Sequence, residues 1–215
     1  MNFDVEWMLR IFPAVIIGLT VHEWAHAYTA YKLGDTTAKD QGRLTLNPLK
    51  HLDPFGTLLI LILGFGWAKP VQFNPNNLKH KHRDEILISI AGPLSNLLLA
   101  IVFLICARVL LSMGPSDPNG SVFLTLDTLV LWAILNFGLA IFNMIPLPPL
   151  DGSHLYTTFF NKISPALANR LYSLGMLVLV GILLIENLAG VDILPIGRYM
   201  RELTGFFMNL LGFNG

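Results

Sequence analysis

The sequence predicts an all-α polytopic membrane protein with about four to six transmembrane helices. Of the 215 residues, 53% are hydrophobic and only 13% are charged, and the mean hydropathy is +0.60. Ordinary soluble domains carry about 25% charged residues, so the shortage of charge sets this chain apart from them. We therefore expect a multi-pass protein of the cell membrane that contacts the lipid bilayer along much of its length.

Four apolar segments reach the length of about 20 residues that a spanning helix requires. They are residues 7–33, 86–113, 122–145 and 171–189. Two further segments, 55–67 and 193–213, are too short or too mixed in composition to be assigned as spans from the sequence. An apolar run of about 10 to 14 residues more often marks a re-entrant or interfacial piece. We therefore predict a short re-entrant or β-like segment near residues 55–75.

The organisation of the chain predicts a single domain over residues 1–215, because no long linker, charge run or repeat divides it. Its core would cover about residues 7–160, followed by C-terminal helices over about residues 165–215. The 14 basic and 14 acidic side chains balance, so we expect no nucleic acid among the partners.

Short loops that are rich in lysine and arginine stay on the cytoplasmic side of the membrane. The distribution of these residues therefore predicts the orientation of the chain. The loops 32–54 and 68–85 each hold four of these residues, whereas the loop 113–121 holds none. The first two loops are therefore predicted to be cytoplasmic, so the segment 55–67 between them must enter and leave on the same side. The N-terminus, with Asp4 and Glu6, is predicted to lie outside.

Residues 22–26 read HEWAH and lie inside the first apolar segment. Each ionisable group at membrane depth costs about 2.5 to 3.5 kcal/mol to insert, so such groups usually face the bundle interior and serve a function. On a helix, His22 and His26 lie one turn apart on one face and can bind one metal ion, while Glu23 can still reach a water molecule. This HExxH pattern is the signature of zinc metalloproteases, with two histidine ligands and a glutamate as general base. The alternative is that both histidines only hydrogen-bond to neighbouring helices.

A catalytic zinc site has three protein ligands and one open position, so the sequence must supply a third ligand. The candidates are His51, Asp53, His80, His82, Asp151 and His154. We favour Asp151, because the prolines of FNMIPLPPL end a helix just before it and leave it on a turn that can point into the bundle. Asp151 is also predicted to lie on the cytoplasmic side, as HEWAH does. His154 is the second choice, and the alternative role for Asp151 is capping of the following helix.

HEWAH in the first span together with NMIPLPPLDG at the end of a later one resembles the site-2 proteases, the intramembrane zinc metalloproteases of peptidase family M50. The stretches RLTLNPLKHLDPFGT, GWAKPVQFNP and AGPLSN also look like a compact prokaryotic branch of that family. We find no stretch long enough for the PDZ domain that many relatives carry. The resemblance covers about residues 14–160, and no motif after about Pro165 matches.

The resemblance implies one zinc ion (Zn2+) per chain, bound by His22, His26 and Asp151. It also implies that Glu23 is the catalytic base and that Asn143 holds the substrate or an oxyanion near the metal. The implied activity is hydrolysis of peptide bonds within or near the transmembrane segments of membrane-protein or peptide substrates, as in regulated intramembrane proteolysis.

A substrate of this kind must be partly unwound, because a helix hides its amides in internal hydrogen bonds. An extended substrate segment can pair with an exposed backbone edge. Residues 71–73 are rich in β-forming residues and are a candidate edge, and an ordinary interfacial loop is the alternative.

Two other classes of function stay open at this stage. A membrane transporter of metal ions or protons also uses intramembrane His, Asp and Glu residues, but it would need polar groups in both halves of the membrane. Here these groups cluster on one side. A catalytically silent membrane scaffold would keep the metal and bind helices without cutting them, and the intact Glu23 argues against it.

Overall fold

The structure, a computed structural model, describes residues 5–63, 66–114, 121–191 and 193–213. Its long helices are α1 (Val5–Lys32), α4 (Lys81–Ser112), α5 (Ser121–Asn143) and α7 (Pro165–Ala189). Within the described residues, these four are the helices long and apolar enough to cross a membrane. They lie where the sequence predicts spans, so the prediction of an all-α polytopic membrane protein is confirmed.

The ends of the long helices differ from the predicted ends of the spans. Helix α4 begins at Lys81 instead of near residue 86, and α7 begins at Pro165 instead of near residue 171. At α7 the side chain of Ser164 accepts a hydrogen bond from the Leu167 N–H, which caps the helix. Hydropathy locates the part of a helix that lies in lipid, whereas caps and turn residues determine where the helix itself begins.

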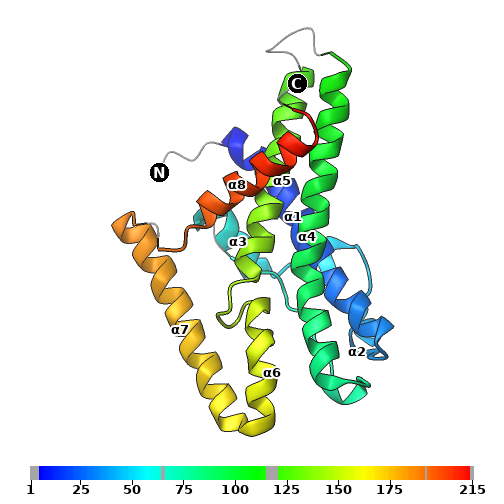
Figure 1. Cartoon of the computed structure of the whole chain (residues 1–215), viewed down its shortest axis with the longest axis vertical. Helices are drawn as coiled ribbons and strands as arrows, with labels where there is room; N and C mark the ends of the chain where they lie inside the picture. The colour runs from blue at the N-terminus through cyan, green and yellow to red at the C-terminus, as the bar shows by residue number, and fades with distance from the viewer. Residues whose placement is uncertain (1–4, 64–65, 115–120, 192, 214–215) are drawn as a thin grey trace.

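The shorter elements connect and cover these helices. They are α2 (Thr37–Asp40), η1 (Pro48–Lys50), α3 (Pro54–Leu63), η2 (Pro75–Asn77), η3 (Asp151–Ser153), α6 (His154–Ile163) and α8 (Ile196–Leu210), where η marks a 3-10 helix. Figure 1 shows that α1, α4 and α5 form the central bundle, that α8 crosses α5, and that α6 and α7 form an arm beside the bundle. Helix α7 packs mainly on α6 and is otherwise largely exposed.

Helix α3 has 10 residues and is therefore about 15 Å long, half of the roughly 30 Å thickness of a bilayer core. The chain segments on its two sides lie next to each other, because Leu52 and Ala68 form an isolated antiparallel bridge. The Lys69 N–H also donates to the His51 carbonyl at 2.7 Å. Apart from such pairing, the described part of the chain has no β-strand. This arrangement has the geometry that a re-entrant segment requires.

Apolar side chains of α4 and α5 form the main core, which α8 covers. The buried members are Ala100, Phe103, Leu104, Ala133 and Phe137. Phe207 of α8 stacks on Phe137 with 5.5 Å between the ring centroids. Helix α1 is tied to α5 by an ion pair of 2.5 Å between Arg10 and Asp127. These contacts fix α1, which carries HEWAH, against α4 and α5.

Asp35 anchors the extended segment that precedes α4 to the end of α1. Its carboxylate is fully buried and accepts hydrogen bonds from the Asn74 N–H at 2.8 Å, from Asn77 Nδ2 at 2.7 Å and from the Thr37 hydroxyl at 2.6 Å. Burial alone would raise the pKa of the Asp35 carboxyl, but the hydrogen bonds from Thr37, Asn77 and Asn74 outweigh it and lower the pKa below its ordinary value. The ionised carboxylate therefore stabilises the fold.

We expect Asp35→Asn to lower the free energy of unfolding by about 1–3 kcal/mol, because one acceptor oxygen becomes an NH2 group that faces N–H donors. The stabilisation by Asp35 is fully present above the ordinary pKa of 3.8 and is lost as the pH falls through the lowered pKa. Melting temperatures in detergent at a series of pH values measure both effects. The exposed Asp40→Asn variant is the control, and equal melting of Asp35→Asn and wild type at neutral pH would contradict the anchoring role.

Candidate functional site

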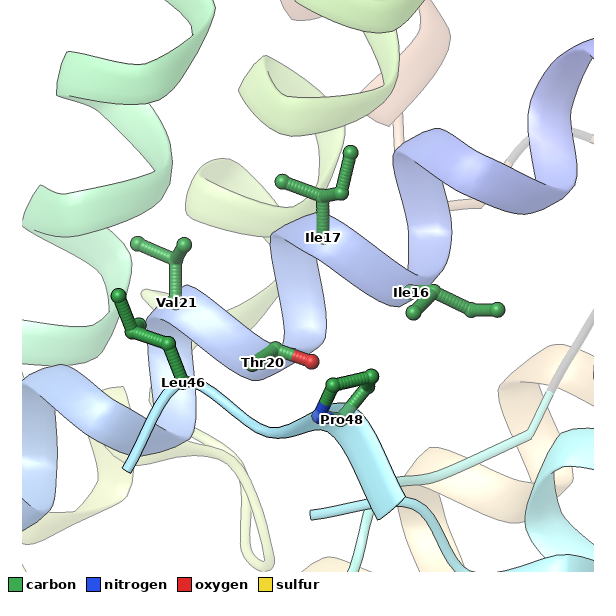
Figure 2. A pocket seen from close by; sticks show the side chains of 6 residues that line it. All are labelled: Ile16, Ile17, Thr20, Val21, Leu46 and Pro48. Atoms are coloured by element: carbon green, nitrogen blue, oxygen red, sulfur yellow. The ribbon is translucent and has the colours of Figure 1, made fainter. Parts of the chain in front are cut away.

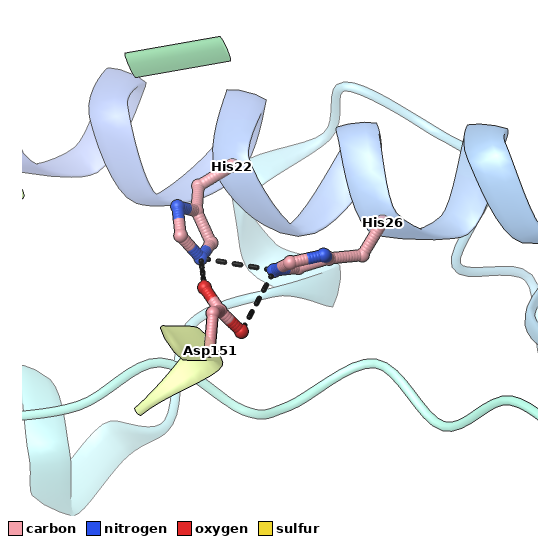
Figure 3. A group of neighbouring side chains, drawn as sticks. All are labelled: His22, His26 and Asp151. Carbon is pink, nitrogen blue, oxygen red and sulfur yellow. Dashed lines mark hydrogen bonds and ion pairs between the residues drawn. The ribbon is translucent and has the colours of Figure 1, made fainter. Parts of the chain in front are cut away.

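The structure brings together His22 and His26 of α1 and Asp151 of η3, although Asp151 lies far away in the sequence. The two Nε2 atoms are 3.0 Å apart, His22 Nε2 is 3.0 Å from Asp151 Oδ2, and His26 Nε2 is 3.4 Å from Asp151 Oδ1. Figure 3 shows both rings pointing toward the carboxylate from the same side of α1. All three side chains are largely shielded from solvent, so a polar cluster is enclosed between α1 and the turn after α5.

Helix α4 fixes the orientation of both histidine rings through their Nδ1 atoms. His22 Nδ1 lies 2.7 Å from Asn96 Oδ1, and His26 Nδ1 lies 2.7 Å from the Ile88 carbonyl. Asn96 Nδ2 donates to the Gly18 carbonyl and to Asn136 Oδ1, which turns Asn96 Oδ1 toward His22. Since both partners of the rings are acceptors, each Nδ1 carries a proton and donates it, and each Nε2 points at Asp151.

This donor set fits a divalent metal ion. Asp151 Oδ2 is buried and accepts no hydrogen bond among the described residues. Two imidazole Nε2 atoms and a carboxylate therefore face one another, and a metal cation bound between them would offset the burial of the carboxylate charge. Ligand atoms about 2.1 Å from one zinc ion at tetrahedral angles lie about 3.4 Å apart, close to the separations seen here. Hydrogen bonds donated by the Nδ1–H groups of ligand histidines are the usual second layer of such sites.

Two glycines allow the group to assemble. A Cβ atom on Gly92 of α4 would overlap the ring of His26 and would lie 2.7 Å from Cε1 of His22. A Cβ atom on Gly152 would overlap the Met144 carbonyl, so Gly152 lets the turn that carries Asp151 fold against the end of α5. Both positions require glycine, because neighbouring atoms fill the space that a Cβ atom would take.

Glu23 lies beside this group and has its own partners. Its Oε2 atom accepts a hydrogen bond of 2.7 Å from the Val71 N–H and is 4.0 Å from Nη2 of Arg43. The Glu23 side chain is 11% exposed, so the carboxylate is shielded but reachable. A carboxylate held next to a metal-ligand cluster can act as a general base toward a water molecule.

The loop that carries Arg43 turns back along α1. It closes a pocket of about 220 Å³ with the helix (Figure 2). The residues that line this pocket are Ile16, Ile17, Thr20, Val21, Leu46 and Pro48. In the same loop His51 is buried, with Nε2 2.7 Å from the Thr45 carbonyl. Burial lowers the pKa of His51 and the nearby Arg43 charge lowers it further, while the Thr45 bond and Glu23 oppose the shift. A neutral His51 thus belongs to the loop structure.

The other residues considered from the sequence lie elsewhere. Asp53 Oδ1 accepts a hydrogen bond from the Gly56 N–H at the start of α3. His154 lies next to Asp151 but points to Phe73, with 6.4 Å between the ring centroids, and His80 is on the surface. In the part of the chain that the structure describes, the group of possible metal ligands contains only His22, His26 and Asp151.

Asn143 and Asn96 each have a hydrogen-bond partner in the structure. Asn143 Nδ2 donates to the Leu139 carbonyl of its own helix at 3.0 Å, and its role toward a substrate stays a prediction. Asn96, which the sequence suggests as a helix-packing residue, holds the ring of a candidate metal ligand. The only signal for that role is the spacing of Gly92 and Asn96 by one helical turn, which places both on the face toward α1.

Known proteins resemble this chain in sequence. A model of peptidase family M50 matches residues 121–185. A protein of Bacillus subtilis (strain 168) named "Putative zinc metalloprotease YwhC" is 48% identical over 153 residues, which cover 70% of this chain and 68% of that protein. "Putative zinc metalloprotease Rip2" of Mycolicibacterium smegmatis is 28% identical over 211 residues, 94% of this chain and 75% of that protein. No solved structure matches the chain.

A more distant relative comes from an archaeon. "Zinc metalloprotease MJ0392" of Methanocaldococcus jannaschii is 27% identical over 162 residues, which cover 75% of this chain and 37% of that protein.

We expect Gly92→Ala to lower the affinity for metal by roughly 10–100-fold, because the new methyl group displaces the two histidine rings. Alanine favours a helix over glycine by about 1 kcal/mol, so weaker metal binding would not come from a weaker helix. Metal content of the purified protein and competition with a chelator measure the change. Gly181→Ala in α7 is the matched control, since nothing lies within 4 Å of its Cβ position. Equal metal affinity of both variants would contradict the close contact at Gly92.

Proposed function

This chain belongs to peptidase family M50 and is a zinc metalloprotease of the membrane, and from that premise we propose that it cuts other membrane proteins within or near their transmembrane segments. The observation that carries the proposal is the depth of the candidate ligands. His22 and His26 lie in the apolar stretch Met8–Lys32, about 9 to 15 Å along the helix from its end at Lys32. Chemistry at that depth acts on peptide bonds that lie in the bilayer.

We assign one zinc ion per chain to His22, His26 and Asp151. Zinc held there supplies a Lewis acid that polarises the scissile carbonyl and makes water more acidic. Other protein residues position these ligands. Asn96 and the Ile88 carbonyl hold the histidine rings, and the turn at Gly152 places the Asp151 carboxylate beside them. Three protein ligands leave one position open, as a catalytic site requires.

Glu23 is proposed as the general base. It takes a proton from the attacking water and later gives it to the amine that leaves. Asn143 is proposed to donate a hydrogen bond to the substrate carbonyl, which gains negative charge during the attack.

The substrate is proposed to bind as an extended strand along residues 71–73. In the described chain, the backbone N–H groups of Gln72 and Phe73 form no hydrogen bond, while the Val71 N–H already binds Glu23. A free edge next to the base supports pairing with an unwound substrate, and a helical substrate has no free amides to offer.

The remaining parts of the proposal concern the whole chain. We propose a single domain over residues 1–215, in which the core at about 7–160 carries the site and the helices at about 165–215 pack beside it. The lysines and arginines of the loops 32–54 and 68–85 support an active site that faces the cytoplasm and an N-terminus outside.

Two substitutions separate metal binding from catalysis. We expect Glu23→Gln to keep zinc and to lower cleavage of a model transmembrane peptide by roughly 10²–10⁴-fold, because the base is lost. We expect Asp151→Ala to lose zinc and activity together, because a ligand is lost. Zinc content and peptide products of the purified variants measure both.

The exposed Glu202→Gln in α8 is the control and keeps zinc and activity. A Glu23→Gln protein that still cuts the peptide would refute the assignment of the base. Zinc flux into vesicles that Glu23→Gln leaves unchanged, without cleavage by the wild type, would favour a transporter instead.

A further inference from the structure

Arg43 is a buried cation close to the base. Its side chain is only 6% exposed, although it belongs to a loop. Arginine is almost never this buried unless it is paired, because a buried charge needs a partner. Its Nη2 atom donates to the Lys69 carbonyl at 2.5 Å and lies 4.0 Å from Glu23 Oε2. One nitrogen thus faces both a backbone carbonyl and the carboxylate of Glu23.

Lys69 is held on both of its backbone groups by the loop that carries Arg43. Its carbonyl accepts from Arg43, and its N–H donates to the His51 carbonyl at 2.7 Å. In an extended chain, the backbone groups of residues two apart face the same side. The Val71 N–H, two residues further along the chain, donates to Glu23 Oε2, and this oxygen lies 4.0 Å from the Arg43 nitrogen that binds the Lys69 carbonyl. Fixing Lys69 fixes the position of this donor.

The two oxygens of Glu23 have different surroundings. Oε2 accepts the Val71 N–H and faces Arg43, whereas Oε1 accepts no hydrogen bond from any residue that the structure describes. A free carboxylate could exchange the two oxygens by rotating about its last bond. The donor at Val71 and the charge at Arg43 both favour Oε2 on their side and so keep Oε1 on the other.

We propose that Arg43 is a positioning residue for Glu23: it holds the backbone at residues 69–71 so that the Val71 N–H binds Oε2 and leaves Oε1 to take the proton from water. The inference rests on the proposed function of Glu23 as base. Arg43 itself touches no reacting atom in this scheme. It acts through Lys69 and Val71.

The first test needs no variant. Residue-resolved amide hydrogen exchange of the full-length wild type in detergent compares Val71 with Gln72 and Phe73, whose amides are free. We expect Val71 to exchange at least about tenfold more slowly than its two neighbours, because its N–H is bonded. A Val71 amide that exchanges as fast as Gln72 overturns the proposal.

The second test uses Arg43→Met, which keeps most of the side-chain length and removes the charge and the donors. We expect the Val71 protection to fall and kcat for a model transmembrane peptide to fall by roughly 10–100-fold, as small misplacements of catalytic groups do. Zinc content stays within about twofold, because neither Arg43 nor Glu23 is a metal ligand in this scheme. Arg43→Lys, which keeps the charge and a donor, retains more of kcat than Arg43→Met.

Arg198→Met in α8 is the control. It removes an exposed, ion-paired arginine outside the site and leaves kcat and Val71 exchange unchanged. An unchanged kcat in Arg43→Met, or a loss of kcat that follows the loss of zinc, overturns the positioning role. If Arg43→Met does not fold, Arg43→Lys and the wild-type exchange data decide. A wild type that cuts no peptide refutes the proposed function, while amide exchange still decides whether Arg43 holds Val71.

Discussion

The structure depends on one electrostatic constraint: two imidazole nitrogens and a carboxylate meet in an apolar bundle. The Nδ1 atoms of His22 and His26 are bound to acceptors, so both Nε2 atoms point at the Asp151 carboxylate. A carboxylate buried in this way needs a positively charged partner. Many features of the fold, from the position of α4 against α1 to the turn after α5, serve to hold these groups in place.

The surroundings of the site divide into a side built by helix α4 and a side built by loops. On the helical side, α4 reaches both histidine rings with Asn96 and the Ile88 carbonyl, and Gly92 allows the close approach. On the other side, loops supply the Arg43 guanidinium and the Val71 amide near Glu23. Metal affinity and base orientation therefore depend on different parts of the chain.

The sequence predicts the features that are local or compositional. Hydropathy locates the four spanning helices, and the HEWAH spacing identifies two histidines on one helical face because helix geometry is regular. The prolines before Asp151 favour a turn there. The contacts of Asn96, Arg43 and Val71 could not be predicted, because they join segments of ordinary composition that are far apart in the chain. The starts of α4 at Lys81 and of α7 at Pro165 could not be predicted from hydropathy either, because polar turns and caps determine them.

The contact of α7 with the turn after α5 links the site to the arm formed by α6 and α7. Gly175 of α7 lies so close to Pro148 that a Cβ atom there would overlap the proline ring. Pro148 is three residues before Asp151, so α7 packs directly against the turn that carries the third candidate ligand. The arm beside the bundle is therefore in contact with the candidate site, and its packing against Pro148 is part of what holds the carboxylate-bearing turn in place.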